Sequence, residues 1–180
     1  YPNEQWIVLL ETNRGCPFSC SYCDWGTATH AKVYTYDLER IGKEIDWFSN
    51  RKIEFIYCCD ANFGILERDI EIVKYVAENK KRYGYPKSLS VQNTKNSTER
   101  SYEIQKVLSD AGLNKGVTLS LQSMNIETLK SVNRQNISVE VFQELQHKFT
   151  ADNVETYTDI ILALPEETYE TFKDGVSFVI

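Results

Sequence analysis

Three of the five cysteines, Cys16, Cys20 and Cys23, form a C-x3-C-x2-C run within eight residues. This spacing lets three thiolates point at one object, and soft thiolates favour zinc or iron–sulfur clusters. A structural zinc site normally closes with four protein ligands, and an electron-transfer cluster with four cysteines. The run therefore predicts a metal centre with three cysteine ligands and an open fourth position.

Other interpretations of the cysteines stay open at this stage. The run lies in a loop between Gly15 and Gly26, and His30 could complete a zinc site instead. Cys58 and Cys59 end an apolar run, where free cysteine behaves as a small hydrophobic residue. An odd, clustered set of cysteines without secretory features indicates metal or redox chemistry rather than a disulfide framework.

The overall composition gives no support to several classes of function. The 180 residues carry a net charge of −6, which gives no support to a general nucleic-acid surface, because phosphate binding needs an excess of Lys and Arg. No apolar run reaches about 18 residues and no charged-then-apolar leader is visible, so we expect neither a membrane span nor a signal peptide. The default expectation is a cytoplasmic protein.

Short apolar runs alternate with segments of helical periodicity. The runs suit strands buried on both faces, and they cover residues 6–10, 53–59, 89–91, 117–121 and 157–164. The intervening segments have one apolar stripe each, which comprises Leu38, Ile41, Ile45 and Phe48, then Ile70, Val73, Val76 and Ala77, then Ile104, Val107, Leu108 and Ala111. Asp37 and Ser138 suit N-caps, and Gly84 suits a helix end.

Strands that alternate with helices predict a parallel sheet with right-handed crossovers. Periodicity alone leaves two architectures open, an open doubly wound sheet and part of a βα barrel. In either one the functional site lies at the carboxyl ends of the strands. The loops after Leu10, Cys59, Gln92, Leu121 and Leu164 are therefore expected to converge, and the cysteine run follows the first of them.

The cysteine run also resembles the signature of a known family. Cys16, Cys20, Tyr22 and Cys23 match the CxxxCxΦC motif of the radical S-adenosylmethionine (radical SAM) enzymes, where Φ is aromatic. The resemblance covers essentially the whole chain and implies an α/β fold, the partial (β/α)6 TIM-like barrel of that family. Because five βα units are counted, we expect residues 1–180 to be a single radical SAM core domain, truncated after the fifth unit of a longer chain.

The resemblance implies a specific chemistry. Cys16, Cys20 and Cys23 would hold three irons of a 4Fe-4S cluster, and the fourth iron would bind S-adenosylmethionine. Reductive cleavage of that cofactor yields a 5′-deoxyadenosyl radical, which abstracts hydrogen from the substrate. The partners implied are a small-molecule or peptide substrate and a one-electron reductant such as flavodoxin or ferredoxin. The alternative class is an iron–sulfur electron carrier or a zinc-binding structural module.

The resemblance also suggests residues that contact S-adenosylmethionine. Asp60 and Asn62 follow the second predicted strand, where relatives bind the amino group of the cofactor, and an Asx-stabilised turn is the competing interpretation. Ser120 and Gln122 end the fourth strand and, with Arg134, resemble the Gln-Ser…Leu…Arg pattern of coproporphyrinogen-dehydrogenase-like members. Arg134 has the planar charged fork that suits a carboxylate, and a solvated surface arginine is the alternative.

The segment from Asp159 to Thr168 resembles the fifth-strand motif D-x-I-x-G-L-P-G-E-T, which lies along the adenine in relatives. Ala163 and Glu166 replace its two glycines. Backbone atoms and apolar contacts at Ala163 and Leu164 are therefore expected to hold the adenine, although close approach is less assured without glycine.

The residues flanking the cysteines resemble one branch of the family. Glu11-Thr-Asn-Arg-Gly-Cys16 and Cys23-Asp-Trp-Gly26 are similar to the same stretches in members with an amino-terminal cobalamin-binding domain. The resemblance implies that the longer protein uses cobalamin, in methyl transfer or another cobalamin-assisted radical reaction. The sequence does not identify the substrate.

Overall fold

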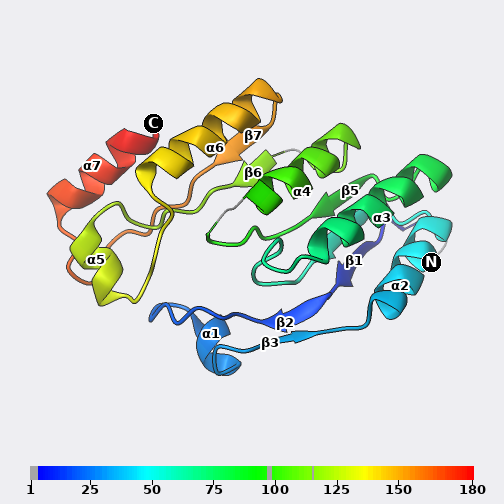
Figure 1. Cartoon of the computed structure of the whole chain (residues 1–180), viewed down its shortest axis with the longest axis horizontal. Helices are drawn as coiled ribbons and strands as arrows, with labels where there is room; N and C mark the ends of the chain where they lie inside the picture. The colour runs from blue at the N-terminus through cyan, green and yellow to red at the C-terminus, as the bar shows by residue number, and fades with distance from the viewer. Residues whose placement is uncertain (1–3, 97–98, 115) are drawn as a thin grey trace.

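The computed structural model describes residues 4–96, 99–114 and 116–180. Within these residues five parallel strands alternate with helices, as predicted, and Figure 1 shows the helices that follow these five strands, α2, α3, α4, α6 and α7, arranged across the molecule in chain order. The units are β1 (Ile7–Leu10) and α2 (Leu38–Asn50), β4 (Phe55–Cys58) and α3 (Asp69–Tyr83), β5 (Ser88–Ser90) and α4 (Glu99–Asp110), β6 (Gly116–Thr118) and α6 (Val139–Ala151), and β7 (Glu155–Tyr157) and α7 (Tyr169–Val179).

The predicted ends of the helices are confirmed where the structure describes them. Asp37 caps α2 by accepting hydrogen bonds from the backbone of Glu39 and Arg40, and Ser138 caps α6. Gly84 ends α3 in the left-handed conformation with φ of 76°, which glycine adopts at low cost. These local signals therefore position the helices on the sheet.

Four short elements were not predicted. An antiparallel pair, β2 (Asn13–Gly15) and β3 (Val33–Thr35), brackets the cysteine run. Helix α1 (Asp24–Ala28) lies between these two strands, and α5 (Ile126–Ser131) follows β6. The position predicted for the fifth strand, 157–164, is wrong for most of its length. Strand β7 covers Glu155–Tyr157, and beyond it Ile160 forms an isolated bridge to Gln122.

The parallel ladder is interrupted in the described part of the chain. Strands β1, β4 and β5 form one sheet and β6 and β7 form another. Side-chain amides occupy the region between β5 and β6, where Gln105 donates to Asn93 at 2.5 Å and accepts from Asn114 at 2.6 Å. Asn93 donates in turn to the Thr118 carbonyl at 3.4 Å. A partly buried chain of polar side chains thus connects the two sheets.

The hydrophobic core is correspondingly divided in two, on the helix-covered faces of the two sheets. The first cluster, around β1, β4 and β5, includes Leu10, Ile41, Ile45, Ile56, Val73, Val76, Leu89, Ile104 and Leu108. The second, around β6 and β7, includes Val117, Leu119, Leu121, Phe142, Leu145, Phe149 and Val154.

The prediction that the strands are buried on both faces is wrong for β1, β4 and β7, where Tyr157 is 53% exposed. Ile7 and Leu9 are 66% and 70% exposed, and Tyr57 is 37% exposed, while the alternate residues Leu10 and Ile56 are buried. Side chains alternate between the faces of a strand, and helices cover one face only. The uncovered face lines a cavity of about 710 Å³ with Trp6, Ile7, Phe55 and Tyr157 among its walls.

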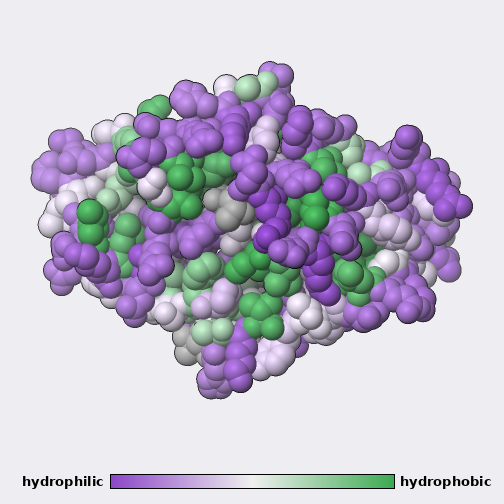
Figure 2. Space-filling view, viewed as in Figure 1, coloured by the Kyte–Doolittle hydropathy of each residue, from purple (hydrophilic) through white to green (hydrophobic). Residues whose placement is uncertain are grey.

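The view in Figure 2 shows a largely hydrophilic surface interrupted by separate hydrophobic patches. None of the described helices combines the length and the apolar character needed to cross a membrane.

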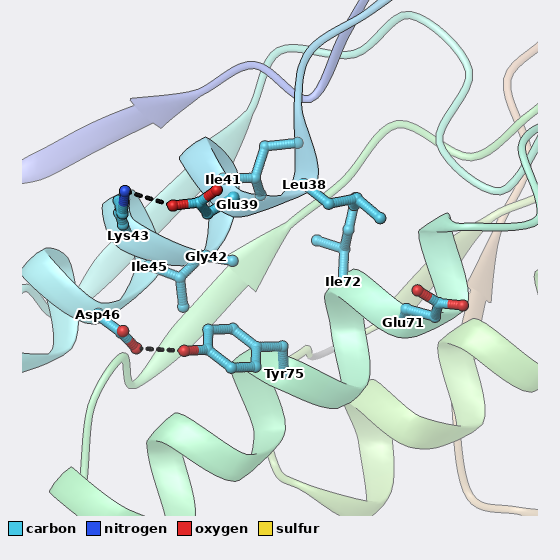
Figure 3. A pocket seen from close by; sticks show the side chains of 10 residues that line it. All are labelled: Leu38, Glu39, Ile41, Gly42, Lys43, Ile45, Asp46, Glu71, Ile72 and Tyr75. Carbon is cyan, nitrogen blue, oxygen red and sulfur yellow. Dashed lines mark hydrogen bonds and ion pairs between the residues drawn. The ribbon is translucent and has the colours of Figure 1, made fainter.

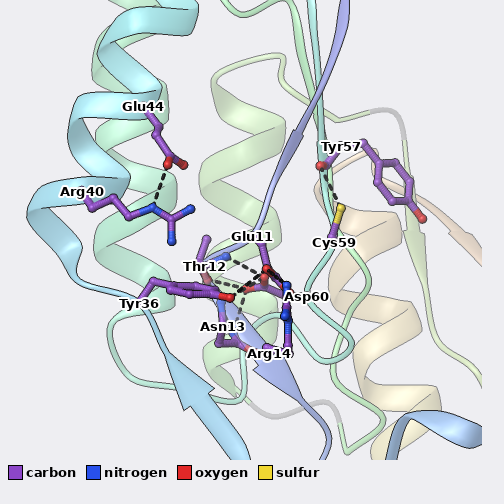
Figure 4. A network of polar contacts seen from close by, with 10 residues as sticks. All are labelled: Glu11, Thr12, Asn13, Arg14, Tyr36, Arg40, Glu44, Tyr57, Cys59 and Asp60. Carbon is purple, nitrogen blue, oxygen red and sulfur yellow. Dashed lines mark hydrogen bonds and ion pairs between the residues drawn. The ribbon is translucent and has the colours of Figure 1, made fainter. Parts of the chain in front are cut away.

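A buried carboxylate joins β1 to β4 (Figure 4). Asp60, two residues after β4, is 1% exposed. It accepts hydrogen bonds from the backbone N–H of Thr12 at 2.8 Å and of Asn13 at 3.2 Å, from the Asn13 amide at 2.7 Å, and from the Thr12 hydroxyl. Burial raises the pKa of Asp60, and the donors of Thr12 and Asn13 oppose that effect. The chain leaving β1 is therefore fixed by the end of β4.

Replacing Asp60 by alanine is expected to destabilise the protein strongly. The substitution leaves four donors of Thr12 and Asn13 buried without an acceptor, and one unsatisfied buried group costs about 1–3 kcal/mol. We expect a loss of at least about 3 kcal/mol in the free energy of unfolding, measured with urea. Asp174→Ala on the exposed face of α7 is the control, expected to stay within about 0.5 kcal/mol of the unsubstituted protein. Equal stability of the two variants would contradict this role for Asp60.

Candidate functional site

The cysteine loop, residues 16–23, connects β2 to α1. Cys16 and Cys20 are buried, at 2% and 3% exposure, and Cys23 is half-buried. The N–H of Cys23 donates to the carbonyl of Cys20 at 3.0 Å, and the N–H of Ser21 donates to the carbonyl of Val132, after α5, at 3.0 Å. The loop is thus folded on itself and tied to the segment that follows β6.

Two glycines allow the close packing around this loop. A Cβ atom on Gly26, in α1, would lie 1.8 Å from the carbonyl oxygen of Phe18. A Cβ on Gly15 would lie 2.0 Å from the carbonyl oxygen of Lys32, and Gly15 also has φ of 112°. The glycines that flank the cysteines are therefore required for close backbone approach, which is more specific than the flexibility inferred from the sequence.

Two side chains from other loops donate hydrogen bonds to the cysteine sulfurs. Asn62, four residues after β4, donates from Nδ2 to Sγ of Cys16 at 3.0 Å. Lys95, five residues after β5, donates from Nζ to Sγ of Cys20 at 3.0 Å. The carboxyl ends of two neighbouring strands thus meet the cysteine loop, as the parallel fold predicted.

The surroundings of the cysteines differ in whether they favour the thiolate or the neutral thiol. Burial acts to raise the pKa of the Cys20 thiol, but the hydrogen bond and the positive charge of Lys95 outweigh it and lower the pKa. Burial raises the pKa of both Cys58 and Cys59. Because the thiolate is the form that binds metals, Cys20 is suited to be a ligand, and Cys58 fits the structural role expected from the sequence.

The donor set fits an iron–sulfur cluster. Among the described residues no three His, Cys, Asp or Glu side chains are placed to hold a single metal ion, and His30, the candidate fourth zinc ligand, is exposed. A four-iron cluster binds each thiolate to a separate iron, so its ligands need not converge on one point. Sulfur atoms that already accept hydrogen bonds from Asn62 and Lys95 provide the surroundings that cluster ligands use.

Arg134 connects the cysteine loop to the end of β6. Its guanidinium donates to the hydroxyl of Tyr22 at 3.1 Å, to the carbonyl of Ser120 at 2.5 Å and to Oδ1 of Asn136 at 2.7 Å. The side chain is 5% exposed, so the alternative of a solvated surface arginine is wrong. Burial raises the pKa of Tyr22 to about 12.

Ser120 and Gln122 were predicted to end the fourth strand, but they follow β6, which ends at Thr118, and they contact the segment that follows β7. Ser120 donates from its hydroxyl to Asp159 at 2.9 Å. Gln122 has φ of 67°, and its backbone exchanges hydrogen bonds of 2.8 Å with Asp159 and Ile161. The structure therefore gathers Ser120, Gln122 and Arg134 around one strand end.

The turn after β7 contains Ala163, Leu164 and Glu166. Leu164 is 7% exposed and Ala163 is exposed. Ala163 and Glu166, which replace the glycines of the family motif, have φ of 63° and 64°. The backbone thus keeps at both positions a left-handed conformation that glycine adopts most readily.

Sequence reasoning missed two features of this site. Lys95 was not selected, although its position shortly after the third predicted strand was an available signal. The pairing of Asp60 with Thr12 and Asn13, whose backbone and side chains donate to its carboxylate, was also missed.

Two further cavities differ in their relation to the cysteines. One of about 460 Å³ lies beside Cys20 and is lined by Phe18, Lys95 and Arg134 among others. Another of about 420 Å³ is a groove between α2 and α3, where Tyr75 donates to Asp46 at 2.8 Å (Figure 3). The predicted site residues are absent from the walls of that groove, and we assign it no part in the chemistry.

Comparison with known proteins gives a consistent result. Residues 10–179 match the family model of the Radical SAM superfamily. The chain is 44% identical over 172 residues to the 2-(S-pantetheinyl)-carbapenam-3-carboxylate methyltransferase of Streptantibioticus cattleyicolor, and equally to the cobalamin-dependent radical SAM methyltransferase TokK of Streptomyces tokunonensis. Each match covers 96% of this chain and 25% of the relative. The chain therefore spans about a quarter of the length of these relatives.

The fold is also similar to that of solved structures. The radical S-adenosylmethionine methyltransferase TsrM of Kitasatospora setae superimposes with a TM-score of 0.80 at 17% sequence identity. The match covers 96% of this chain and 33% of TsrM. This likeness confirms the predicted fold, the TIM-like barrel type of the family.

A methyl group at Gly26 is expected to impair loading of the metal site. Gly26→Ala places Cβ against the Phe18 carbonyl and must displace the loop between Cys16 and Cys20. We expect iron and sulfide bound after anaerobic reconstitution to fall at least about threefold, as an order-of-magnitude estimate for loss of ligand positioning. Gly42→Ala is the matched control, because its Cβ would meet only the Tyr75 ring at 3.7 Å. Equal iron content in the two variants would contradict the close-packing argument.

Proposed function

This chain belongs to the radical SAM superfamily, and from that premise we propose that Cys16, Cys20 and Cys23 bind three irons of a 4Fe-4S cluster. The observation that carries the proposal is that Asn62 and Lys95, from two different strand ends, both donate hydrogen bonds to sulfur atoms of this loop. Hydrogen bonds to ligand sulfurs orient the ligands and tune the metal.

The open fourth iron is proposed to bind S-adenosylmethionine. When bound, the two cofactors supply reductive cleavage of the sulfonium and a 5′-deoxyadenosyl radical. Ser120, Gln122 and Arg134 are proposed to position S-adenosylmethionine from the segments that follow β6 and α5, and Ala163 and Leu164 from the turn after β7. Arg134 already holds Tyr22 of the cysteine loop against Ser120, so it would align the cluster with the cofactor-binding strand end.

The segment after β4 contributes in two ways to this proposal. Asn62 holds Cys16 directly, and its Oδ1 is buried without a hydrogen-bond partner among the described residues. That oxygen could accept a hydrogen bond from the ammonium group of S-adenosylmethionine. Asp60 was predicted to bind the same ammonium group. In the structure it accepts hydrogen bonds from Thr12 and Asn13, and it is proposed to hold the start of the cysteine loop in place.

The substrate is proposed to bind at the uncovered inner face of the sheet. The cavity of about 710 Å³ has apolar walls at Trp6, Ile7 and Phe55 and polar ones at Gln92 and Thr118. Such a mixed lining suits a small molecule or a peptide. A one-electron reductant such as flavodoxin or ferredoxin would supply the electron.

Residues 1–180 are proposed to be the radical SAM core domain of a cobalamin-dependent methyltransferase. The support is the 44% identity to two methyltransferases, one of them named as cobalamin-dependent. Loading the full-length protein with cobalamin under anaerobic conditions tests this assignment. A protein that retains no cobalamin would remove it.

The main experiment is electron paramagnetic resonance of the anaerobically reconstituted, dithionite-reduced protein, with and without S-adenosylmethionine. We expect the signal of a reduced 4Fe-4S cluster that changes when S-adenosylmethionine is added, because the cofactor binds the open iron. Cys20→Ala is expected to abolish the signal. Cys59→Ala is the matched control, because Cys59 is a half-buried thiol bonded only to the Tyr57 carbonyl in the described structure.

Two results would argue against the proposed function. One is a signal that does not respond to S-adenosylmethionine, which indicates four protein ligands. The other is stoichiometric zinc in place of iron, which indicates a structural site.

A further inference from the structure

Lys95 is held beside the cysteine loop by two contacts. Its Nζ donates to Sγ of Cys20 at 3.0 Å and lies 5.2 Å from the centre of the Phe18 ring. Both partners belong to the same loop, and a cation over an aromatic face is attracted to it. The ammonium group is therefore fixed relative to Cys20.

The positive charge of Lys95 is not neutralised by a carboxylate within the described part of the chain. Neighbouring cations of the same cavity are engaged elsewhere, since Lys130 pairs with Glu127 at 2.8 Å. Arg134 donates to Tyr22, Ser120 and Asn136. Lys95 thus brings a positive charge to the sulfur of Cys20, whereas the donor to the sulfur of Cys16 is the neutral amide of Asn62.

We propose that Lys95 raises the reduction potential of the cluster bound by Cys20. This inference rests on the proposed function. Reduction adds one electron, supplied by dithionite in the test below, and no bond or proton is exchanged. The added negative charge is stabilised by a cation and by hydrogen bonds at the ligand sulfur, both of which raise the potential. Lys95 is accordingly a positioning and tuning residue that acts through Cys20.

The test is a redox titration of the reconstituted protein, followed by electron paramagnetic resonance and carried out without S-adenosylmethionine. At the midpoint potential of the unsubstituted protein, Lys95→Met is expected to lower the ratio of reduced to oxidised cluster about tenfold. For one electron that change corresponds to about 59 mV. Lys95→Arg keeps the charge and is expected to restore most of the ratio.

A matched control and a second neutral variant complete the design. Lys81→Met, at the exposed end of α3, makes the same charge change away from the cysteine loop and is expected to leave the midpoint unchanged. Lys95→Gln is neutral but can still donate a hydrogen bond to sulfur. Its midpoint potential is expected to be lower than that of Lys95→Arg.

The outcomes separate this inference from the function on which it rests. An unchanged midpoint in Lys95→Met, with a cluster that still responds to S-adenosylmethionine, overturns the inference alone. A midpoint in Lys95→Arg as low as that in Lys95→Met also overturns it, because packing rather than charge would be responsible. Failure of both neutral variants to load iron would assign Lys95 to assembly and overturn it too. Absence of any 4Fe-4S signal in the unsubstituted protein would overturn both proposals.

Discussion

The buried carboxylate of Asp60 is the constraint on which the rest of the site depends. Placing a carboxylate in the interior is costly unless donors surround it, and Thr12 and Asn13 provide four. Those two residues lead directly into the cysteine loop, so the same interaction that satisfies Asp60 also determines where the loop begins. Asn62, two residues after Asp60, donates a hydrogen bond to the sulfur of Cys16. The end of β4 therefore fixes the loop at two points.

The other strand ends hold different parts of the same loop. Lys95, after β5, contacts Cys20, and Arg134, after β6, contacts Tyr22. The interrupted ladder between β5 and β6 makes these contacts more important, because the two sheets are joined there by side-chain amides rather than by strand pairing. The cysteine loop consequently connects both sheets at their carboxyl ends. A group bound by the cysteine loop would therefore be held by residues from both sheets.

Patterns among neighbouring residues predicted much of this fold. Features that depend on contacts between distant parts of the chain were not predicted. The stripe of Ile41, Ile45 and Phe48 and the cap Asp37 depend on near neighbours in sequence, and α2 formed as expected. Strands β2 and β3 have three residues each and pair only because the chain returns after α1, so periodicity could not reveal them. The exposure of Leu9 follows from which face the helices leave uncovered. The hydrogen bond that Glu167 accepts from Ser123 at 2.7 Å joins residues 44 apart in the sequence, so it too was out of reach of a local pattern.

The turn after β7 shows that a motif can persist in its torsion angles after its letters have changed. Ala163 and Glu166 occupy the left-handed region although each has a Cβ, at a cost of roughly 1–2 kcal/mol per residue. The surrounding hydrogen bonds and the burial of Leu164 must supply that energy. A search that requires glycine at these positions would overlook this chain, whereas one that describes the path of the main chain would find it. In this turn the main-chain path is therefore a more useful search criterion than the identity of the two residues.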